Sequence, residues 1–491
     1  MRDIIFTFFN YFVFFYTSML AIFFVTFAFL SFISLKRRKD YYVESYMRKT
    51  IKESPYTPGI SVIAPAFNEE KTIIDNVNSM LALEYPLFEV VIVNDGSTDS
   101  TLKKMIEHYE LIEVPYAYIE RIKTKPFRRL LKSTSPKYSR LIVVDKENGG
   151  TKADASNAGI NVSSYPYFIC TDVDCILEKY ALYRCISPII SSDKQVIAVS
   201  GTMLMANGCV VKDGQIVDVR TPRTPIPLFQ NLEYMRSYLI GKMGWSAING
   251  MPNVSGGFGL FDRSVAIAAG GYDGTSFAED MDLITRMVGY MCDFSRPYKI
   301  VQIPDTCCWT EGPPNLAMLY RQRTRWARGL FQTLNIHRKM IFKKTYKQMG
   351  LLTLPYMFVF EFLAPIIELV GLIVFIYLAF TGAVNWNTAW MIYLTIYTFC
   401  QFLSIVVITY DYYVGMLYKR GYEYLWIIIA SILEPIFYHP IITFCSLRGY
   451  LSYLTNRDFK WKNMERKGFK QKEESADGTD ITAMKPEPAT I

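Results

Sequence analysis

A run of 32 residues without one charged side chain, from Ile4 to Leu35, most strongly limits how this chain can fold. About 20 apolar residues cross a bilayer as a helix, and at about 1.5 Å per residue this run is too short for two crossings with a turn. It is also longer than the apolar part of a signal peptide, about 7–15 residues, and it has no fitting cleavage site. We therefore expect one long or tilted membrane helix within residues 1–40.

The charges that follow this run orient it. Residues 36–39 are Lys-Arg-Arg-Lys, and basic residues beside a membrane helix stay on the cytoplasmic side. The N-terminus is then expected outside the cell. No spanning run occurs between about residues 40 and 345, so we expect residues 41–310 to form one cytosolic domain.

Three apolar blocks return late in the chain, at about residues 351–382, 384–410 and 422–447. They predict membrane helices over 357–447, after amphipathic interfacial helices over 311–356 and before a basic, partly disordered tail over 448–491. Three crossings would leave that tail outside, whereas its charges favour the inside. Either one block does not cross or the charge rule fails here. The segments predict a multi-pass protein of the cytoplasmic membrane.

Four ionisable residues lie inside or beside these apolar blocks. Charged groups at membrane depth are costly and often line a polar path. The alternative is that they lie at the depth of the membrane interface, because prolines break the helices nearby. The residues are Glu361, Glu368, Glu434 and His439.

Composition argues against several kinds of site. The nine cysteines lack CxxC spacing, which suits reduced thiols better than a disulfide framework. The three histidines are far apart, so no zinc site is expected. A net charge of +8 is ordinary for a protein that lies against a membrane, so membrane lipids are expected partners and nucleic acid is not.

Strand-like and helix-like stretches alternate before residue 172. Apolar spacing over residues 70–83 predicts a helix, and alternation of this kind predicts an α/β domain with a parallel sheet covered on both faces. Ligands bind at the carboxyl ends of strands in such sheets, and Asp95 and Asp172 both fall there. The predicted strands are Ile60–Ala64, Glu89–Val93, Leu141–Val144 and Tyr167–Thr171.

Asp172 and Asp174 stand one residue apart, directly after the last of these strands. An isolated Asp-x-Asp most often caps a helix or lies in a solvated turn. The functional alternative is a divalent cation, Mg²⁺ or Mn²⁺, which one or two carboxylates commonly hold together with substrate phosphates. The surrounding motifs favour the cation.

Four motifs accompany TDVD, in the order APAFNEE (64–70), VNDGSTD (93–99), FAEDMDL (277–283) and QRTRWARG (322–329). Each is weak alone, but together and between apolar flanks they resemble family 2 of the glycosyltransferases. The subgroup they resemble is the membrane-embedded processive synthases of cellulose, chitin, hyaluronan and poly-N-acetylglucosamine. The resemblance implies a Rossmann-like GT-A fold, a UDP-sugar donor, a divalent cation, a polysaccharide or lipid-linked acceptor, and accessory export proteins.

The resemblance also assigns residues to the donor. Ala64, Phe67, Glu69 and Asp95 are expected at the nucleoside, although Glu69 also suits helix capping. Lys152 follows two glycines before a predicted helix, a place suited to phosphate. A flexible turn with a solvated lysine is the alternative there.

Asp280 is the expected general base. The family's Thr-Glu-Asp motif stands here as Ala278-Glu279-Asp280, so Glu279 is the second catalytic candidate. The missing threonine puts the predicted contacts with the acceptor in doubt more than the predicted catalytic chemistry. Asp282 competes with Asp280 on spacing alone, and acids in the first turn of a helix also suit its dipole without any catalytic role.

Gln322, Arg325 and Trp326 fall at i, i+3 and i+4, and therefore share one face of a helix. The resemblance places Gln322 and Arg325 at the nucleotide sugar and Trp326 at the acceptor. Gly256 and Phe258, in a glycine-rich stretch, are also expected at the acceptor. A basic amphipathic helix on the membrane surface is the alternative.

Residues 120–140 carry eight basic side chains where many relatives have a short connection. We expect a solvated surface excursion, with contact to anionic lipid as the alternative.

The sequence thus predicts a membrane-bound inverting glycosyltransferase that adds sugar from a UDP-sugar, with UDP-N-acetylglucosamine favoured, to a growing polysaccharide and exports it. A non-processive enzyme that adds a single sugar to a lipid carrier is the alternative. A transporter or receptor with a nucleotide-binding domain would give no reason for Asp280 or for the motif around Arg325.

Overall fold

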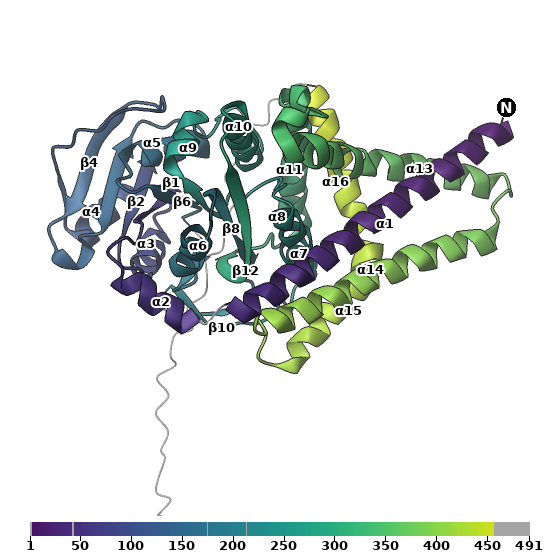
Figure 1. Ribbon diagram of the computed structural model, residues 1–491, viewed down its shortest axis with the longest axis horizontal. Coiled ribbons are helices and arrows are strands. Elements are labelled where there is room, and N and C mark those ends of the chain that lie inside the picture. Colours follow the sequence, from purple (N-terminus) through teal and green to yellow (C-terminus); the bar gives the residue numbers. More distant parts are fainter. Residues whose placement is uncertain (1, 42–43, 174, 213, 456–491) are drawn as a thin grey trace, which may run out of the picture.

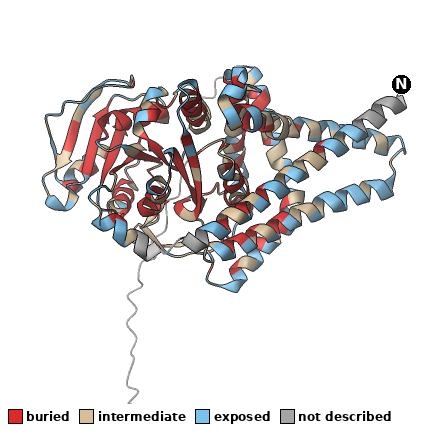
Figure 2. Cartoon of the chain, in the orientation of Figure 1, coloured by how far each residue is buried: buried red, intermediate tan, exposed pale blue. Residues whose placement is uncertain are grey.

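The computed structural model describes residues 2–41, 44–173, 175–212 and 214–455. A domain built on a large twisted sheet lies at one end, and long helices extend from the other (Figure 1). Buried residues gather in the sheet and the helices against it, whereas the long helices are largely exposed (Figure 2).

The main sheet has ten strands in the order β3-β4-β5-β2-β1-β6-β11-β8-β12-β7. β1, β2, β5 and β6 are parallel, as predicted. β11 lies antiparallel between β6 and β8, so the complete sheet is mixed beyond the four predicted strands. The strands are β1 Ile60–Ala66, β2 Phe88–Asp95, β3 Leu111–Glu113, β4 Phe127–Ser133, β5 Leu141–Lys146, β6 Tyr167–Thr171, β7 Ile176–Leu177, β8 Gln195–Met205, β11 Phe258–Asp262 and β12 Tyr298–Thr310, with β9 Val210–Lys212 and β10 Gln215–Asp218 in a separate pair.

The central strands form because they are buried on both faces. Every residue of β2 and β5 is buried, and both are rich in valine and isoleucine, which suits a strand covered by helices on each side. The helices of the domain are α2 Glu44–Glu53, α3 Ile73–Leu81, α4 Thr101–Tyr109, α5 Lys152–Val162, α6 Ala181–Ile190, α7 Pro225–Arg236, α8 Met243–Ala247, α9 Arg263–Ala268, α10 Glu279–Asp293 and α11 Leu316–Ile336, with short helical turns η1 Pro136–Tyr138, η2 Ser237–Lys242, η3 Arg338–Met340 and η4 Lys344–Tyr346.

The basic stretch 120–140 is more ordered than a simple surface excursion. It contains β4, which pairs with β5 and β3. The side chains of Leu130 and Leu131 in this strand are buried and anchor it to the domain. Arg129 of the same strand pairs with Asp145 at 3.1 Å. β4 lies at the end of the domain farthest from the long helices (Figure 1), which speaks against contact with lipid.

Within the part of the chain that the structure describes, three helical segments are long and apolar enough to cross a membrane. They are Tyr11–Arg37, Met349–Phe380 and Trp386–Val414, and a bent pair, Gly421–Phe437 with His439–Leu454, would be a fourth if it counts as one span. The predicted single long apolar helix near the N-terminus is present, and its crossing of a membrane stays a prediction. The elements involved are α1 Arg2–Tyr41, η5 Met349–Thr353, α12 Leu354–Tyr356, η6 Met357–Phe362, α13 Ala364–Phe380, α14 Trp386–Val414, α15 Gly421–Phe437 and α16 His439–Leu454.

Buried polar contacts fasten these helices to the sheet domain. Glu423, at the start of α15, is fully buried and accepts from the N–H of Thr221 at 3.0 Å. Arg223 donates to both oxygens of the same carboxylate at 3.0 Å. In α1, the carbonyl of Ala28 accepts from the hydroxyl of Tyr410 in α14 at 2.6 Å. Helices far apart in the sequence are therefore held as one unit with the domain.

Candidate active site

Hydrogen bonds join the two loops that follow β1 and β2. The N–H of Asn68 donates to Ser97 Oγ at 3.1 Å, and its side-chain oxygen accepts from the N–H of Thr98 at 2.8 Å. Asn68 has a φ of 57°, in the left-handed region that asparagine tolerates better than most residues. The loops thus hold Phe67 and Glu69, each half-buried, at the edge where nucleoside contacts are predicted.

Asp95 ends β2 and is buried. Its Oδ1 accepts from the ammonium of Lys146 at 2.7 Å and from the N–H of Gly149 at 3.0 Å. Lys146 is fully buried and also pairs with Asp154 at 2.5 Å. One oxygen of Asp95 therefore ties β2 to the glycine-rich turn before α5, and its contact with a nucleoside stays a prediction.

Lys152 is the first residue of α5, and the Thr151 side chain caps that helix. Its ammonium lies 2.6 Å from Asp172 Oδ1 and donates to the carbonyl of Gly256 at 2.7 Å. Burial alone would lower the pKa of Lys152, but the Asp172 carboxylate raises that pKa above its ordinary value. The glycine turn, the end of β6 and the loop before β11 therefore meet at one ammonium group.

Gly256 also contacts the predicted base. Its N–H donates to Asp280 Oδ2 at 3.0 Å, and the N–H of Met281 donates to Asp280 Oδ1 at 2.9 Å. Glu279, half-buried at the start of α10, differs in its surroundings. Burial raises the pKa of Glu279 to about 7, an effect that Lys152 opposes and Asp280 adds to. The two adjacent acids are therefore held differently, Asp280 by two backbone amides and Glu279 in a site that favours its protonated form.

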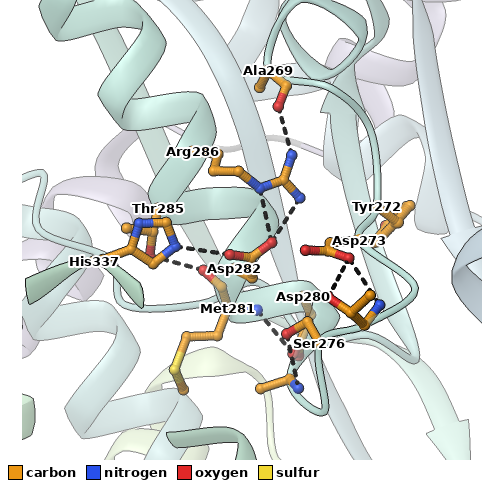
Figure 3. Close-up of polar contacts among 12 residues, drawn as sticks. Ala269, Tyr272, Asp273, Ser276, Asp280, Met281, Asp282, Thr285, Arg286 and His337 are labelled. Carbon is orange, nitrogen blue, oxygen red and sulfur yellow. Dashed lines mark hydrogen bonds and ion pairs between the residues drawn. The ribbon is translucent and has the colours of Figure 1, made fainter. Parts of the chain in front are cut away.

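Asp282 points away from Asp280 (Figure 3). It is buried, with Oδ1 2.8 Å from His337 Nε2 and Oδ2 accepting from Arg286 Nε at 2.8 Å. Although burial acts in the opposite direction, these partners hold the pKa of Asp282 below its ordinary value. A carboxylate committed to this buried cluster is poorly placed to take a proton from an acceptor.

The helix α11 brings Gln322, Arg325 and Trp326 to one half-buried face, as their spacing predicts. Arg325 Nη1 donates to the carbonyl of Phe277 at 3.5 Å, just before Glu279. The approach is close because α11 has a glycine at its contact: a Cβ on Gly329 would lie 2.6 Å from the Cβ of Ala278. The predicted helix therefore lies directly against the start of α10.

Two of the predicted contact residues have no exposed side chain. Ala64 lies within β1 and Phe258 begins β11, and both are fully buried in the hydrophobic core. Their burial speaks against side-chain contact with a ligand. The sequence alone does not distinguish the last buried positions of a strand from the positions at the exposed edge of the sheet. Asp174, the second predicted metal ligand, lies outside the described residues.

Lys146 is a site residue that the sequence analysis missed. It bridges Asp95 and Asp154 without being exposed at all. The signal was available, because a lysine two residues beyond the apolar run 141–144 needs a carboxylate partner if it is buried.

The chemistry of Asp172 fits a hard cation. Its carboxylate lies at the end of β6 and its side chain is 35% exposed. No group of three or more His, Cys, Asp or Glu side chains able to hold a metal occurs among the residues that the structure describes. Mg²⁺ and Mn²⁺ often take only one or two carboxylates together with phosphates, so Asp172 with substrate oxygens is compatible with either.

Two family models match this chain over most of its length. The model for glycosyl transferase family 2 matches residues 61–203, and the model for glycosyl transferase family group 2 matches residues 222–444. The first range contains the nucleotide-side motifs and Asp172, and the second contains Asp280 and Trp326.

Among curated proteins, the chain is similar to poly-beta-1,6-N-acetyl-D-glucosamine synthases. It is 29% identical over 278 residues to that of Staphylococcus aureus strain COL, covering 56% of this chain and 55% of that protein. It is 27% identical over 282 residues to that of Staphylococcus epidermidis, covering 57% of each. The chain thus matches a little over half the length of these relatives.

Two solved structures are similar to the chain, each with a low TM-score. A mannosyltransferase, PcManGT, from Pyrobaculum calidifontis in complex with GDP-Man and Mn²⁺ gives a TM-score of 0.47 at 17% identity, covering 88% of this chain and all of that one. TarS of S. aureus gives a TM-score of 0.33 at 17% identity, covering 57% and 43%. Scores this low carry no weight here. The two family models, over a mixed α/β sheet of the GT-A kind, show that the chain belongs to glycosyltransferase family 2.

Proposed function

We propose that this chain transfers a sugar from a UDP-sugar to a growing polysaccharide at the cytoplasmic face of a membrane and exports the product. The observation that carries the proposal is the meeting of Lys152 and Asp280 at the single residue Gly256. The names of the similar staphylococcal proteins favour UDP-N-acetylglucosamine as donor and a β-1,6-linked polymer as product.

On the acceptor side, Asp280 would take the proton of the attacking hydroxyl. The acceptor oxygen forms its bond to the anomeric carbon as the bond from that carbon to UDP breaks on the opposite face, which inverts the configuration. The backbone amides of Gly256 and Met281 keep Asp280 oriented while its charge is neutralised. Glu279, with its raised pKa, is the second candidate for this role.

On the donor side, positive charge has to meet the diphosphate. Lys152 and Arg325 are proposed for this role, and Phe67 and Glu69 are proposed at the base. Asp172, with Asp174, would hold the divalent cation, which adds positive charge beside the departing UDP. Trp326 and Gly256 are proposed at the acceptor.

The ends of the long helices support a consistent orientation. Arg420, between α14 and α15, pairs with Asp218 of the sheet domain at 3.1 Å, so α13 and α14 leave and return on the domain's side. The α15–α16 pair, bent by 50°, starts at Glu423 beside the domain and ends where Tyr453 meets Asn335 of α11 at 3.0 Å. We propose that this pair dips into the membrane without crossing it, which removes the conflict over the basic tail. The domain limits at residues 40, 310, 356 and 447 remain our proposal.

A polar cluster on the helices supports export. Glu368 of α13 lies 3.1 Å from His439 Nε2 and accepts from Thr443 Oγ1 at 2.6 Å. Glu434 pairs with Arg236 of α7 at 2.7 Å. Polar groups on apolar helices commonly mark a substrate path.

The test uses washed membranes that contain the full chain. With labelled UDP-N-acetylglucosamine we expect UDP release together with a long polymer, loss of both in EDTA, and recovery with excess Mg²⁺ or Mn²⁺. UDP-glucose and UDP-glucuronate serve as matched donors. Membranes that release no UDP from any of these donors would contradict the proposal, and full activity in EDTA would remove the cation from it.

The alternative is a single transfer to a lipid carrier. The same experiment separates the two, because a single transfer gives one labelled, organic-extractable lipid and no polymer. The observation that favours the polymer is the polar cluster at Glu368, which a single transfer would not need.

A further inference from the structure

Three helices meet at the buried side chain of Arg323 in α11. Glu233 of α7 accepts from both terminal nitrogens of the guanidinium, each at 2.6 Å. The hydroxyl of Tyr438, at the break between α15 and α16, accepts from Arg323 at 2.9 Å and donates to Glu233 at 3.0 Å. Both Arg323 and Tyr438 are buried. We call Glu233, Arg323 and Tyr438 the clamp.

The clamp contacts the tryptophan proposed to bind the acceptor. The Arg323 guanidinium carbon lies 4.4 Å from the centroid of the Trp326 ring, within the range of a cation–π contact. Trp326 is half-buried, and one face of its indole is covered by Arg323. The orientation of this ring therefore depends on where the guanidinium is held.

We propose that Glu233 and Tyr438 are positioning residues for acceptor binding, acting through Arg323 on the ring of Trp326. The inference rests on the proposed role of Trp326 as the acceptor's stacking surface.

The chemistry of the clamp suits positioning. A guanidinium held by two parallel hydrogen bonds to one carboxylate is fixed in its plane, which a lysine cannot reproduce. Tyr438 adds a third direction, and its ring packs on Phe229 of α7 with centroids 5.5 Å apart. A planar group fixed in this way also fixes the plane that stacks on it.

The clamp also joins the site to the bent helix pair. Tyr438 is the residue at which α15 ends and α16 begins, and α16 packs closely on α11, where a Cβ on Gly449 would lie 2.6 Å from the carbonyl of Thr324. A purely structural role, joining helices without affecting the ring, is the competing explanation. The two are distinguished by whether effects of the clamp vanish once Trp326 is removed.

The first measurement follows the ring itself. The full chain, labelled with 5-fluorotryptophan, has seven tryptophans, and Trp326→Phe identifies the resonance of residue 326 by ¹⁹F NMR. We expect Tyr438→Phe to shift or broaden that resonance and leave the other six in place. Tyr450→Phe, which removes a buried hydroxyl from the helix α16 that follows Tyr438, is the matched control. An unchanged Trp326 resonance in Tyr438→Phe would overturn the proposal.

The second measurement follows binding. We expect Tyr438→Phe to weaken binding of a β-1,6-linked N-acetylglucosamine pentamer roughly threefold to tenfold, the range for one lost buried hydrogen bond, with UDP affinity within twofold of the parent. In the Trp326→Phe background the same change should have no further effect. Equal losses for UDP and pentamer, or the same loss in both backgrounds, would assign the clamp a structural role only.

Both measurements are repeated on Glu233→Gln, for which we expect a larger effect. If Glu233→Gln does not fold, the results for Tyr438→Phe alone decide between the two roles of the clamp. A parent protein that neither binds the pentamer nor transfers sugar would contradict the proposed function. The fluorine spectra would still decide whether the clamp orients Trp326.

Discussion

At the scale of single residues, Glu279 and Asp280 are neighbours with different surroundings. Two backbone amides hold Asp280, whereas Glu279 is half-buried with a pKa raised to about 7. Enzymes often use such pairs for different tasks, because the environment sets which carboxyl is ionised.

Asp280→Asn keeps the shape of the side chain and removes its basicity. If Asp280 is the base, the rate of sugar transfer should fall by about 10²–10⁴-fold, the usual range for loss of a general base. UDP affinity should stay nearly unchanged, because the carboxylate acts on the acceptor. Transfer and UDP binding are measured on the same preparation, with Asp282→Asn as a comparison. An Asp280→Asn protein that makes polymer at nearly the parental rate would return the role to Glu279.

The raised pKa of Glu279 has a consequence for stability. When a carboxyl binds its proton more tightly in the folded state than in the unfolded state, its ionisation destabilises the folded protein. The cost grows as pH rises from the ordinary value of 4.5 through about 7. Glu279→Gln should therefore unfold at a higher temperature than the parent at pH 8, with a smaller gap at pH 5.

We would measure this by thermal unfolding in detergent and EDTA. Glu107→Gln, the same substitution at an exposed glutamate of α4, is the control for the change of residue type. A gap for Glu279→Gln that is constant between pH 5 and pH 8 would mean that Glu279 ionises at its ordinary pKa.

The positions of several candidate residues were predictable, because the sequence places carboxylates at strand ends and a lysine at a helix start, and the structure has them there. Their roles toward donor and acceptor stay predictions. Spacing did not separate Asp280 from Asp282, because the choice depends on how α10 is rotated. That rotation is set by His337 and Arg286, and His337 lies 55 residues away. The sequence could have marked Lys146 as a lysine in need of a partner, but not which one, because Asp95 and Asp154 come together with it only when the sheet forms.

At the scale of elements, α11 can approach α10 only because residue 329 is glycine. A Cβ there would come within 2.6 Å of Ala278, 2.9 Å of its nitrogen and 3.0 Å of Phe277. Gly329→Ala should therefore push the Arg325–Trp326 face away from Glu279 and lower transfer at least tenfold, since a displacement of about 1 Å at a site can cost 10²-fold.

Gly289→Ala is the matched control, because it adds a methyl to α10 itself where the nearest atom is 3.8 Å away. An alanine in that helix interior should keep activity and raise stability slightly, by roughly 0.5–1 kcal/mol. Transfer rates and unfolding temperatures are measured for both variants. Equal transfer rates for Gly329→Ala and Gly289→Ala would mean that the contact at Gly329 does not position the site.

The order of elements was only partly predictable. The strands around β1 could be found because each is a short apolar run bounded by turn residues. The antiparallel placement of β11 between β6 and β8 joins segments that are about 60 to 90 residues apart, and local patterns carry no signal for that pairing.

At the scale of the whole molecule, the ends of the helices determine which loops share a side of the membrane. Lys419 lies in the α14–α15 loop beside Arg420, whose pairing with Asp218 holds that loop against the sheet domain. Ala383 lies at the exposed turn between α13 and α14. We expect Ala383→Cys to react with an impermeant maleimide in intact cells, and Lys419→Cys only after permeabilisation.

Lys103→Cys, on an exposed site of α4, marks the side of the sheet domain. The native cysteines among the described residues are buried or half-buried, so their background labelling should be low. Labelling of Lys419→Cys and Lys103→Cys from opposite sides would contradict the proposed orientation. Sequence could not decide this point, because hydropathy gives the length of a block but not whether its two ends return to the same surface.

The two hydrogen bonds of Gly256 imply thermodynamic reciprocity between the substrates. Its N–H donates to Asp280 and its carbonyl accepts from Lys152, so in the proposed mechanism one residue contacts both the acceptor side and the donor side. UDP that draws Lys152 toward its phosphates should alter the affinity for acceptor, and acceptor must then alter the affinity for UDP by the same factor, typically about 5–150-fold in coupled sites. Calorimetric titration of each ligand in the presence of the other measures both factors. If neither ligand changes the affinity for the other, Gly256 does not couple the two binding sites.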